Sequence, residues 1–303
     1  MNEIINIFRK EFPYIDREEE TIIKILNNEN TRLIEKRDES NKLIAVSVIN
    51  KNTILLFYVD KKYRNKGIGT LLLNESESYI KANGYKNVVV GAGFDYLMPG
   101  VPTSKKYYDS VNECLAKEVN DNASTFFEKR GYVHSWDCNC FDMKMKLSDF
   151  DKFDNKIDDT INNVKYRWAT LSDLDEIIEC ADDACQYQDN KFSKYYKNED
   201  FYKTTNKQRV IVAEKENKIV GCIIVSAEVE AKNLGNVGCT CVRFAETHQK
   251  IGTNMVILGT QHLHNIGLAN ASLGYTYTGL DKMYGSAGYK ISCYYMMATK
   301  ELN

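Results

Sequence analysis

The chain has 303 residues, of which 43% are hydrophobic and 27% are charged, and its formal net charge at pH 7 is -2. This length exceeds what one ordinary hydrophobic core needs, so we expect two domains. A net charge so close to zero is not typical of nucleic-acid-binding proteins, and we expect no nucleic-acid partner. The N-terminus has no apolar signal segment, and no apolar run reaches about 18 residues. We therefore expect a cytoplasmic protein with no membrane partner.

Nine cysteines make an odd number without a disulfide framework, which indicates reduced thiols. Two pairs, Cys138/Cys140 and Cys239/Cys241, fall in segments that we expect to be strands. The members of such a pair share one strand face, and we favour small buried hydrophobic side chains over a metal site there. We predict no metal.

The first half combines short helices with strands. Apolar spacing predicts helices over residues 2–12 and 18–27 and strands over 31–36, 42–50 and 53–59. The run TILLFYV is continuous and apolar, as in strands that are buried on both faces. A helix follows RNKGIGT and ends at Gly84. We then expect a strand over 87–91, a long loop over 94–118 with the sequence PGVP, a helix over 123–130 and a strand over 138–147.

The second half repeats this order. Residues 148–163 are polar and Asp-rich, as linkers are. Beyond them, NVGCTCVRF matches TILLFYVD, HQKIGTNMVILG matches NKGIGTLLLNES, and GLDKMYGSAGYK matches NASTFFEKRGYV. Matches in the same order indicate a duplicated fold. We predict domains over 1–147 and 164–303, with a linker over 148–163.

The turn over residues 64–70 has the features of an anion site. It lies between a buried strand and a helix, where backbone N–H groups and the helix dipole converge. Gly67 and Gly69 permit a close approach to the backbone, and Arg64 and Lys66 add positive charge. The pattern R-x-x-G-x-G alone is a weak signal, which its setting strengthens.

Two segments, LFYVDKKYRNKGIGTLLL and NDNASTFFEKRGY, resemble the cofactor motif and the second motif of the GCN5-related N-acetyltransferase (GNAT) superfamily. The resemblance covers nearly all of 1–147 and, more weakly, 164–303. It implies an α/β (α+β) chain of two tandem GNAT folds, each with a mixed, mostly antiparallel twisted sheet flanked by helices. It also implies an N-acetyltransferase that uses acetyl-CoA as co-substrate and a small-molecule primary amine as partner.

The resemblance places the cofactor in the first half. It implies a strand that splays from its neighbour and pairs with the pantetheine arm, a turn that holds the pyrophosphate, and two second-motif residues beside the pantetheine and thioester. The implied cofactor-binding residues are Phe57, Tyr58, Val59, Arg64, Asn65, Lys66, Gly67, Ile68, Gly69, Thr70, Asn120 and Phe127.

The source of the catalytic proton is open. The amine must be neutral when it attacks the thioester, and the leaving thiolate needs a proton. Many GNAT members supply this proton from a tyrosine four residues before the last glycine of the second motif, where this chain has Phe127. Either CoA leaves as the thiolate or another group substitutes. The candidate catalytic residues are Asp95, Tyr96, Tyr107, Tyr108, Glu113 and Tyr284.

The second half lacks a complete phosphate turn. Thr247 and Lys250 stand where Arg64 and Gly67 stand in the first half, and we expect the Lys250 side chain to crowd a phosphate. Tyr284 has the family's tyrosine position, but without a phosphate turn we expect a core aromatic residue. We predict a degenerate domain that completes the substrate pocket and the fold.

The acceptor amine is implied by a second resemblance. The PGVP loop and the FFEKRGY helix are similar to those of bacterial enzymes that acetylate glucosamine and glucosaminides, which implies an amino sugar. Aminoglycosides, polyamines and protein amines are alternatives, because the acidic loop fits any cationic amine. A non-catalytic acyl-CoA sensor or interaction module is a further alternative, because Phe127 offers no proton. The sequence predicts no oligomeric state.

Overall fold

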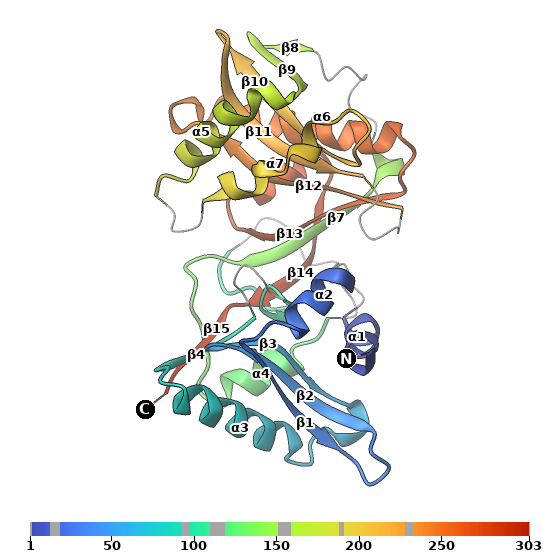
Figure 1. The fold of residues 1–303 in the computed structure, drawn as a ribbon, viewed down its shortest axis with the longest axis vertical. Helices are drawn as coiled ribbons and strands as arrows, with labels where there is room; N and C mark the ends of the chain where they lie inside the picture. Colours follow the sequence, from blue (N-terminus) through green and yellow to red (C-terminus); the bar gives the residue numbers. More distant parts are fainter. Residues whose placement is uncertain are drawn as a thin grey trace. The chain divides into compact units, whose positions relative to one another are not determined.

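The computed structural model describes residues 2–12, 19–91, 97–109, 119–150, 159–187, 191–227 and 233–302. The chain divides into two compact units (Figure 1). Unit 1 consists of Met1–Phe141 and Ser292–Asn303, and unit 2 consists of Asp142–Ile291. Within the described residues, no helix combines the length and the apolar character needed to cross a membrane.

Unit 1 is built on a sheet with the strand order β1-β2-β3-β4-β15-β6. Its elements are α1 (Asn2–Glu11), α2 (Glu19–Leu26), β1 (Thr31–Arg37), β2 (Leu43–Asn50), β3 (Thr53–Val59), α3 (Ile68–Ala82), β4 (Asn87–Val90), β5 (Val101–Thr103), α4 (Asn122–Glu128), β6 (Val133–His134) and β15 (Ala298–Glu301). Along β2, every residue before Asn50 is buried, so both faces of the sheet are covered. Figure 1 shows α3 along one side of this sheet and α1 and α2 toward the other.

The pairing of β3 changes along its length. β3 runs antiparallel to β2 throughout, with a register shift opposite the step from Val48 to Ile49. Its parallel pairing with β4 joins Thr53 to Val89 and Ile54 to Val90. Within the described residues that ladder ends at Ile54, and the remainder of β3 has no ladder partner in the described part of β4, as the resemblance implies for the strand before the turn. One edge of the strand is thereby left for another partner.

The last strand of unit 1 comes from the end of the chain. β15 lies between β4 and β6, and Ala298 pairs with both Val90 and His134. Lys300 also forms an ion pair with Glu77 of α3, at 2.9 Å between Nζ and Oε2. Glu77 accepts a further hydrogen bond from the hydroxyl of Tyr132 at 2.9 Å.

This arrangement differs from the sequence expectation, in which each half ends on its own last strand. β7 (Cys140–Lys146) belongs to the sheet that contains β13 (Asn270–Tyr277), whereas β15 completes the sheet of unit 1. The chain passes from one unit to the other within β7 and within β14 (Lys290–Met296). The bounds of the compact units therefore differ from those of the predicted domains 1–147 and 164–303, because the last residues of the chain join unit 1.

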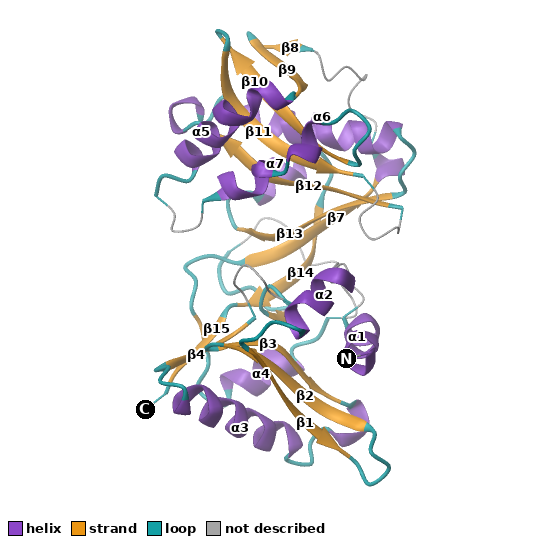
Figure 2. Ribbon diagram, in the orientation of Figure 1, coloured by secondary structure: helices purple, strands orange, loops and turns teal. Residues whose placement is uncertain are grey.

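Unit 2 contains the strand order β7-β13-β12-β11-β10-β9-β8 (Figure 2). Its other elements are β8 (Thr160–Ile161), β9 (Val164–Trp168), α5 (Leu174–Ala184), β10 (Gln208–Lys215), β11 (Lys218–Ser226), β12 (Leu234–Val242), α6 (Ile251–Asn265) and α7 (Asp281–Gly285). β8 falls inside the predicted linker, of which residues 151–158 lie outside the described part of the chain. The β12–α6–β13 succession repeats β3–α3–β4, so the mixed sheets flanked by helices confirm the predicted fold class.

We expect Met296→Ala to lower the free energy of unfolding of unit 1 by about 2–5 kcal/mol, because it removes a fully buried side chain. Met296 packs in the cluster that contains Val88, Val90 and Phe127. Amide hydrogen exchange should show lower protection in β2 and β4 and unchanged protection in β11. The exposed residue Glu301 provides the control, because Glu301→Ala should change stability by less than about 0.5 kcal/mol. A loss of protection confined to β11 would contradict the strand exchange.

Candidate functional site

A groove of about 770 Å³ lies in unit 1. Its walls come from the diverging end of β3, the turn that follows it and helix α4. Most of the predicted cofactor residues line it, namely Phe57, Tyr58, Val59, Arg64, Asn65, Gly67, Gly69, Thr70, Asn120 and Phe127. Lys66 and Ile68 are outside this set. The ammonium of Lys66 lies 5.4 Å from the centre of the Tyr63 ring.

The two glycines of the turn differ in conformation and surroundings. Gly67 has φ +84° and is the N-cap of α3 without a side-chain hydrogen bond. The first N–H groups of α3 are thus left for a partner, as at other anion-binding helix starts. A Cβ at Gly69 would lie 3.2 Å from Cε2 of Phe126, so a larger residue there would have to displace the Phe126 ring by a few tenths of an ångström.

Cationic side chains predominate around the turn. Lys61, Arg64, Lys129 and Arg130 line the groove, together with the carboxylates Glu11 and Asp121. Arg64 is held in place by a hydrogen bond from Nε to the carbonyl oxygen of Val59 at 2.8 Å, and its Nη2 lies 3.8 Å from Oε2 of Glu11. The Asp121 carboxylate accepts hydrogen bonds from Thr103 and Ser104. Such a surface suits an anionic ligand.

Phe127 is a wall of the groove and has no proton to donate. Its side chain is 3% exposed. The ring meets Phe57 and Tyr132 edge to face, with centroids 5.4 and 5.1 Å apart. These contacts place the ring between β3 and the hydrophobic core. The Phe127 ring therefore shapes the wall of the groove and offers no polar group to a ligand.

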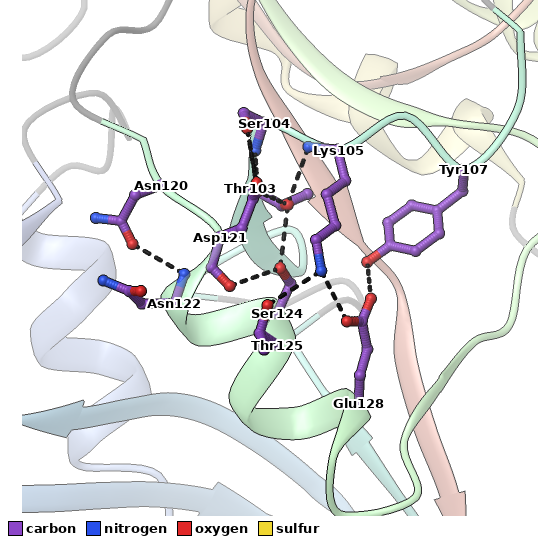
Figure 3. Close-up of polar contacts among 10 residues, drawn as sticks. All are labelled: Thr103, Ser104, Lys105, Tyr107, Asn120, Asp121, Asn122, Ser124, Thr125 and Glu128. Atoms are coloured by element: carbon purple, nitrogen blue, oxygen red, sulfur yellow. Dashed lines mark hydrogen bonds and ion pairs between the residues drawn. The ribbon is translucent and has the colours of Figure 1, made fainter. Parts of the chain in front are cut away.

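The segment before residue 110 is tied to α4 by polar contacts (Figure 3). Asp121 faces Thr103 and Ser104 at the start of the helix. One turn later, Lys105 donates to Oγ1 of Thr125 at 3.1 Å and to Oε2 of Glu128 at 2.7 Å. These contacts hold the PGVP segment against the helix that borders the groove.

The tyrosine candidates of this segment do not line the groove. Tyr107 donates its hydroxyl to Glu128 at 3.1 Å and stacks on His134 with centroids 4.2 Å apart. Burial, and then the Glu128 carboxylate, raises the pKa of Tyr107. Tyr108 donates its hydroxyl to the carbonyl oxygen of Trp136 at 3.0 Å. The other candidates of the long loop, Asp95, Tyr96 and Glu113, lie outside the described residues.

The corresponding turn of unit 2 keeps the backbone shape with different side chains. His248 and Lys250 have φ +64° and +62°, where Asn65 and Gly67 have +59° and +84°. A long side chain therefore extends from the start of α6, where the first unit has none.

Side chains of unit 2 form hydrogen bonds with β12, the strand before that turn. The hydroxyl of Tyr196 donates to the carbonyl oxygen of Cys239. The hydroxyls of Thr240 and Tyr284 lie 3.3 Å apart. Tyr284 is 5% exposed, and burial raises its pKa to about 12. Tyr284 is thus placed as a buried aromatic residue.

The cysteines carry no bond to one another in the described chain, where all eight are free thiols. Among the described residues, no three His, Cys, Asp or Glu side chains are grouped as a metal site requires.

Sequence reasoning did not single out Arg130 and Lys129, which line the groove from the end of α4. A signal was present in the repeat: GLDKMYGSAGYK, aligned with NASTFFEKRGYV, puts Ala287 opposite Arg130 and Ser286 opposite Lys129. The copy that has Lys250 in place of Gly67 lacks these cations too.

Two family models match the sequence. Residues 1–95 match the acetyltransferase (GNAT) family, and residues 120–237 match the N-terminal domain of cilia- and flagella-associated protein 61. No curated protein matches the chain.

Solved structures are similar over nearly the whole chain. One is the GCN5-related glucosamine N-acetyltransferase region of a fungal multi-domain beta-N-acetylglucosaminidase, with 17% identity and TM-score 0.70; the match covers 99% of this chain and 36% of that one. A GCN5-related N-acetyltransferase from Sphaerobacter thermophilus has 15% identity and TM-score 0.64, covering 93% and 85%. A tandem GNAT protein from the clavulanic acid biosynthesis pathway has 11% identity and TM-score 0.64, covering 93% and 87%.

At these identities, the similarity to the solved structures is one of fold, and it extends over both units. The match of the first 95 residues to the GNAT model adds the family. Members of that family use acetyl-CoA to acetylate amines. The first 95 residues thus match the GNAT family model, and the whole chain shares the fold of solved tandem GNAT structures.

Proposed function

We propose that unit 1 binds acetyl-CoA in its groove and transfers the acetyl group to a primary amine of a small molecule, in the cytoplasm. The observation that carries this proposal is the groove itself, where a strand with one free edge meets a cationic, glycine-containing turn. Its volume of about 770 Å³ is within the range of about 300–1,000 Å³ that is usual for ligand pockets.

The residues of the groove fit the two ends of CoA. The segment 57–59 of β3 can pair with the amides of a pantetheine arm, because the described residues of β4 pair only with the start of β3. The start of α3, with Gly67 as an uncapped N-cap, offers N–H groups to a pyrophosphate. Lys61 and Arg64 add the opposite charge.

The acceptor that we propose is an amino sugar. The support is the likeness, over 99% of this chain, to a region described as a glucosamine N-acetyltransferase, and the resemblance of the PGVP loop and second motif to glucosaminide-acetylating enzymes. In the reaction, the neutral amine forms the new C–N bond, the C–S bond of the thioester breaks, and CoA thiol is released. Release of the thiol makes the reaction measurable with any amine.

Only one CoA site per chain is proposed. In unit 2, Lys250 extends from the start of α6, and Tyr196 already binds a backbone carbonyl of β12. Ala287 also leaves the position of Arg130 without a charge. We propose that unit 2 binds no acetyl-CoA. The chain passes between the two units within β7 and β14.

We expect free-thiol release from acetyl-CoA in the presence of glucosamine, with kcat/KM at least about tenfold higher than with an aminoglycoside, spermidine or a lysine-containing peptide. The measurement is a thiol assay over this panel, with mass spectrometry of the acetylated product. A higher kcat/KM with another amine of the panel would show that the proposed acceptor, an amino sugar, is wrong. Tight CoA binding without turnover of any amine would favour the sensor alternative.

Gly67→Lys should fold and lose CoA affinity by at least about 100-fold, measured by calorimetry. Lys250 shows that a lysine can adopt this φ in the second turn, and the strain costs about 1 kcal/mol. A lysine adds positive charge, so a loss of affinity for an anion must come from its bulk. Gly84→Lys is the matched control, because Gly84 has φ +85°, equally open space and no place in the groove. Retained or increased affinity in Gly67→Lys would refute the assigned pyrophosphate site.

Tyr107→Phe, Tyr108→Phe and Tyr284→Phe should each keep kcat within about threefold of the wild type, because none of these hydroxyls lines the groove. Removal of a true general acid costs about 10²–10⁴ in rate. Steady-state kinetics at saturating acetyl-CoA decide this. A loss above about 100-fold in one variant would identify that tyrosine as the proton donor.

A further inference from the structure

Arg130 connects α4 to the first turn of α3. Its guanidinium carbon lies 3.7 Å from the centre of the Phe126 ring. Nη1 donates to the carbonyl oxygen of Phe126 at 2.8 Å, and Nη2 donates to Oγ1 of Thr70 at 2.7 Å. Nε is buried without a hydrogen-bond partner among the described residues. The arginine is thus fixed in one conformation at the wall of the groove.

The contact with Arg130 determines what the Thr70 hydroxyl can do. A guanidinium only donates and keeps its charge at every accessible pH, so Oγ1 of Thr70 acts as an acceptor toward it. The hydroxyl hydrogen of Thr70 then points to another partner. Thr70 lines the groove in the first turn of α3, beside the open N–H groups that follow Gly67. Its hydroxyl is therefore oriented as one more donor at the proposed pyrophosphate site.

Arg130 also contacts Phe126, whose ring lies next to Gly69. One face of its ring lies against the guanidinium, and its edge lies against Gly69, where a Cβ would be 3.2 Å from Cε2. The ring therefore spaces the start of α3 from α4. In unit 2, Met283 has this position next to Gly252, and Ala287 replaces the arginine. Phe126 and Arg130 are thus absent together from the copy that also lacks Arg64 and Gly67.

We propose that Arg130 is a positioning residue for the cofactor: it orients the Thr70 hydroxyl as a donor to the pyrophosphate of acetyl-CoA and, through Phe126, sets the spacing of the glycine turn. This inference rests on the proposed function, since it assumes that CoA occupies this groove. It assigns a cofactor role to a residue outside the turn itself.

The test compares CoA with pantetheine, which lacks the pyrophosphate, by calorimetry on the full chain. Arg130→Gln and Thr70→Val should each raise the Kd for CoA about tenfold, and the Kd for pantetheine should change less than about twofold. In the double variant, the increase in the Kd for CoA should be smaller than the product of the two single increases, because both changes disturb the same Thr70 donor. Arg130→Lys should lie between the wild type and Arg130→Gln, since an ammonium can reach Thr70 but cannot stack as a guanidinium does.

Arg32→Gln is the control, because Arg32 is exposed on β1 and remote from the groove wall. Thr70→Val keeps the arginine and its stacking, so the inference stays testable if Arg130→Gln does not fold. If the wild type does not bind CoA, the proposed function fails. If the wild type binds CoA, the inference is overturned by unchanged affinity in Arg130→Gln, by an equal loss for CoA and pantetheine, or by additive losses in the double variant.

Discussion

The divergence of β3 from β4 after Ile54 is the constraint on which the site depends. A strand inside a sheet normally uses the hydrogen-bonding groups of both edges, and unpaired backbone groups need another partner. The rest of β3 pairs with β2, while its other edge borders the groove. Phe57 and Phe127 meet edge to face at this point. Sheet geometry and aromatic packing together create the place for a ligand that carries amides.

The exchanged strand gives the tandem arrangement a structural reason. β4, which forms the other side of the divergence, is paired along its far edge by β15 from the end of the chain. Lys300 secures that strand to Glu77 of α3, the helix whose start belongs to the phosphate turn. The second half of the sequence therefore contributes its last strand to the sheet of unit 1, although its own turn carries Lys250 in place of a glycine.

Much of the fold was predictable because its signals are local. The strand Thr53–Val59 has the bounds that its apolar run predicted, and the turn behind it has the positive φ at Gly67 that a glycine suits. The exchange of β7 and β15 was not predictable, because the choice of sheet for a short strand depends on long-range packing that no local pattern shows.

In the candidate site, too, local features were predictable from the sequence and long-range contacts were not. Most residues of the turn line the groove, and their part in cofactor binding stays a prediction from the sequence. Arg130, in contrast, reads in the sequence as an ordinary basic side chain before a glycine. Its role depends on Thr70, sixty positions away in the chain, and on the ring of Phe126. The Tyr107 hydroxyl is engaged by Glu128, which no spacing in the sequence indicates.

A crystal structure with acetyl-CoA bound tests the central claim most directly. The account predicts one molecule per chain, with its pantetheine arm along residues 57–59 and its pyrophosphate at residues 64–70, in contact with the hydroxyl of Thr70. A cofactor at the turn over 247–253 of unit 2, or one that leaves the edge of β3 unpaired, would contradict it.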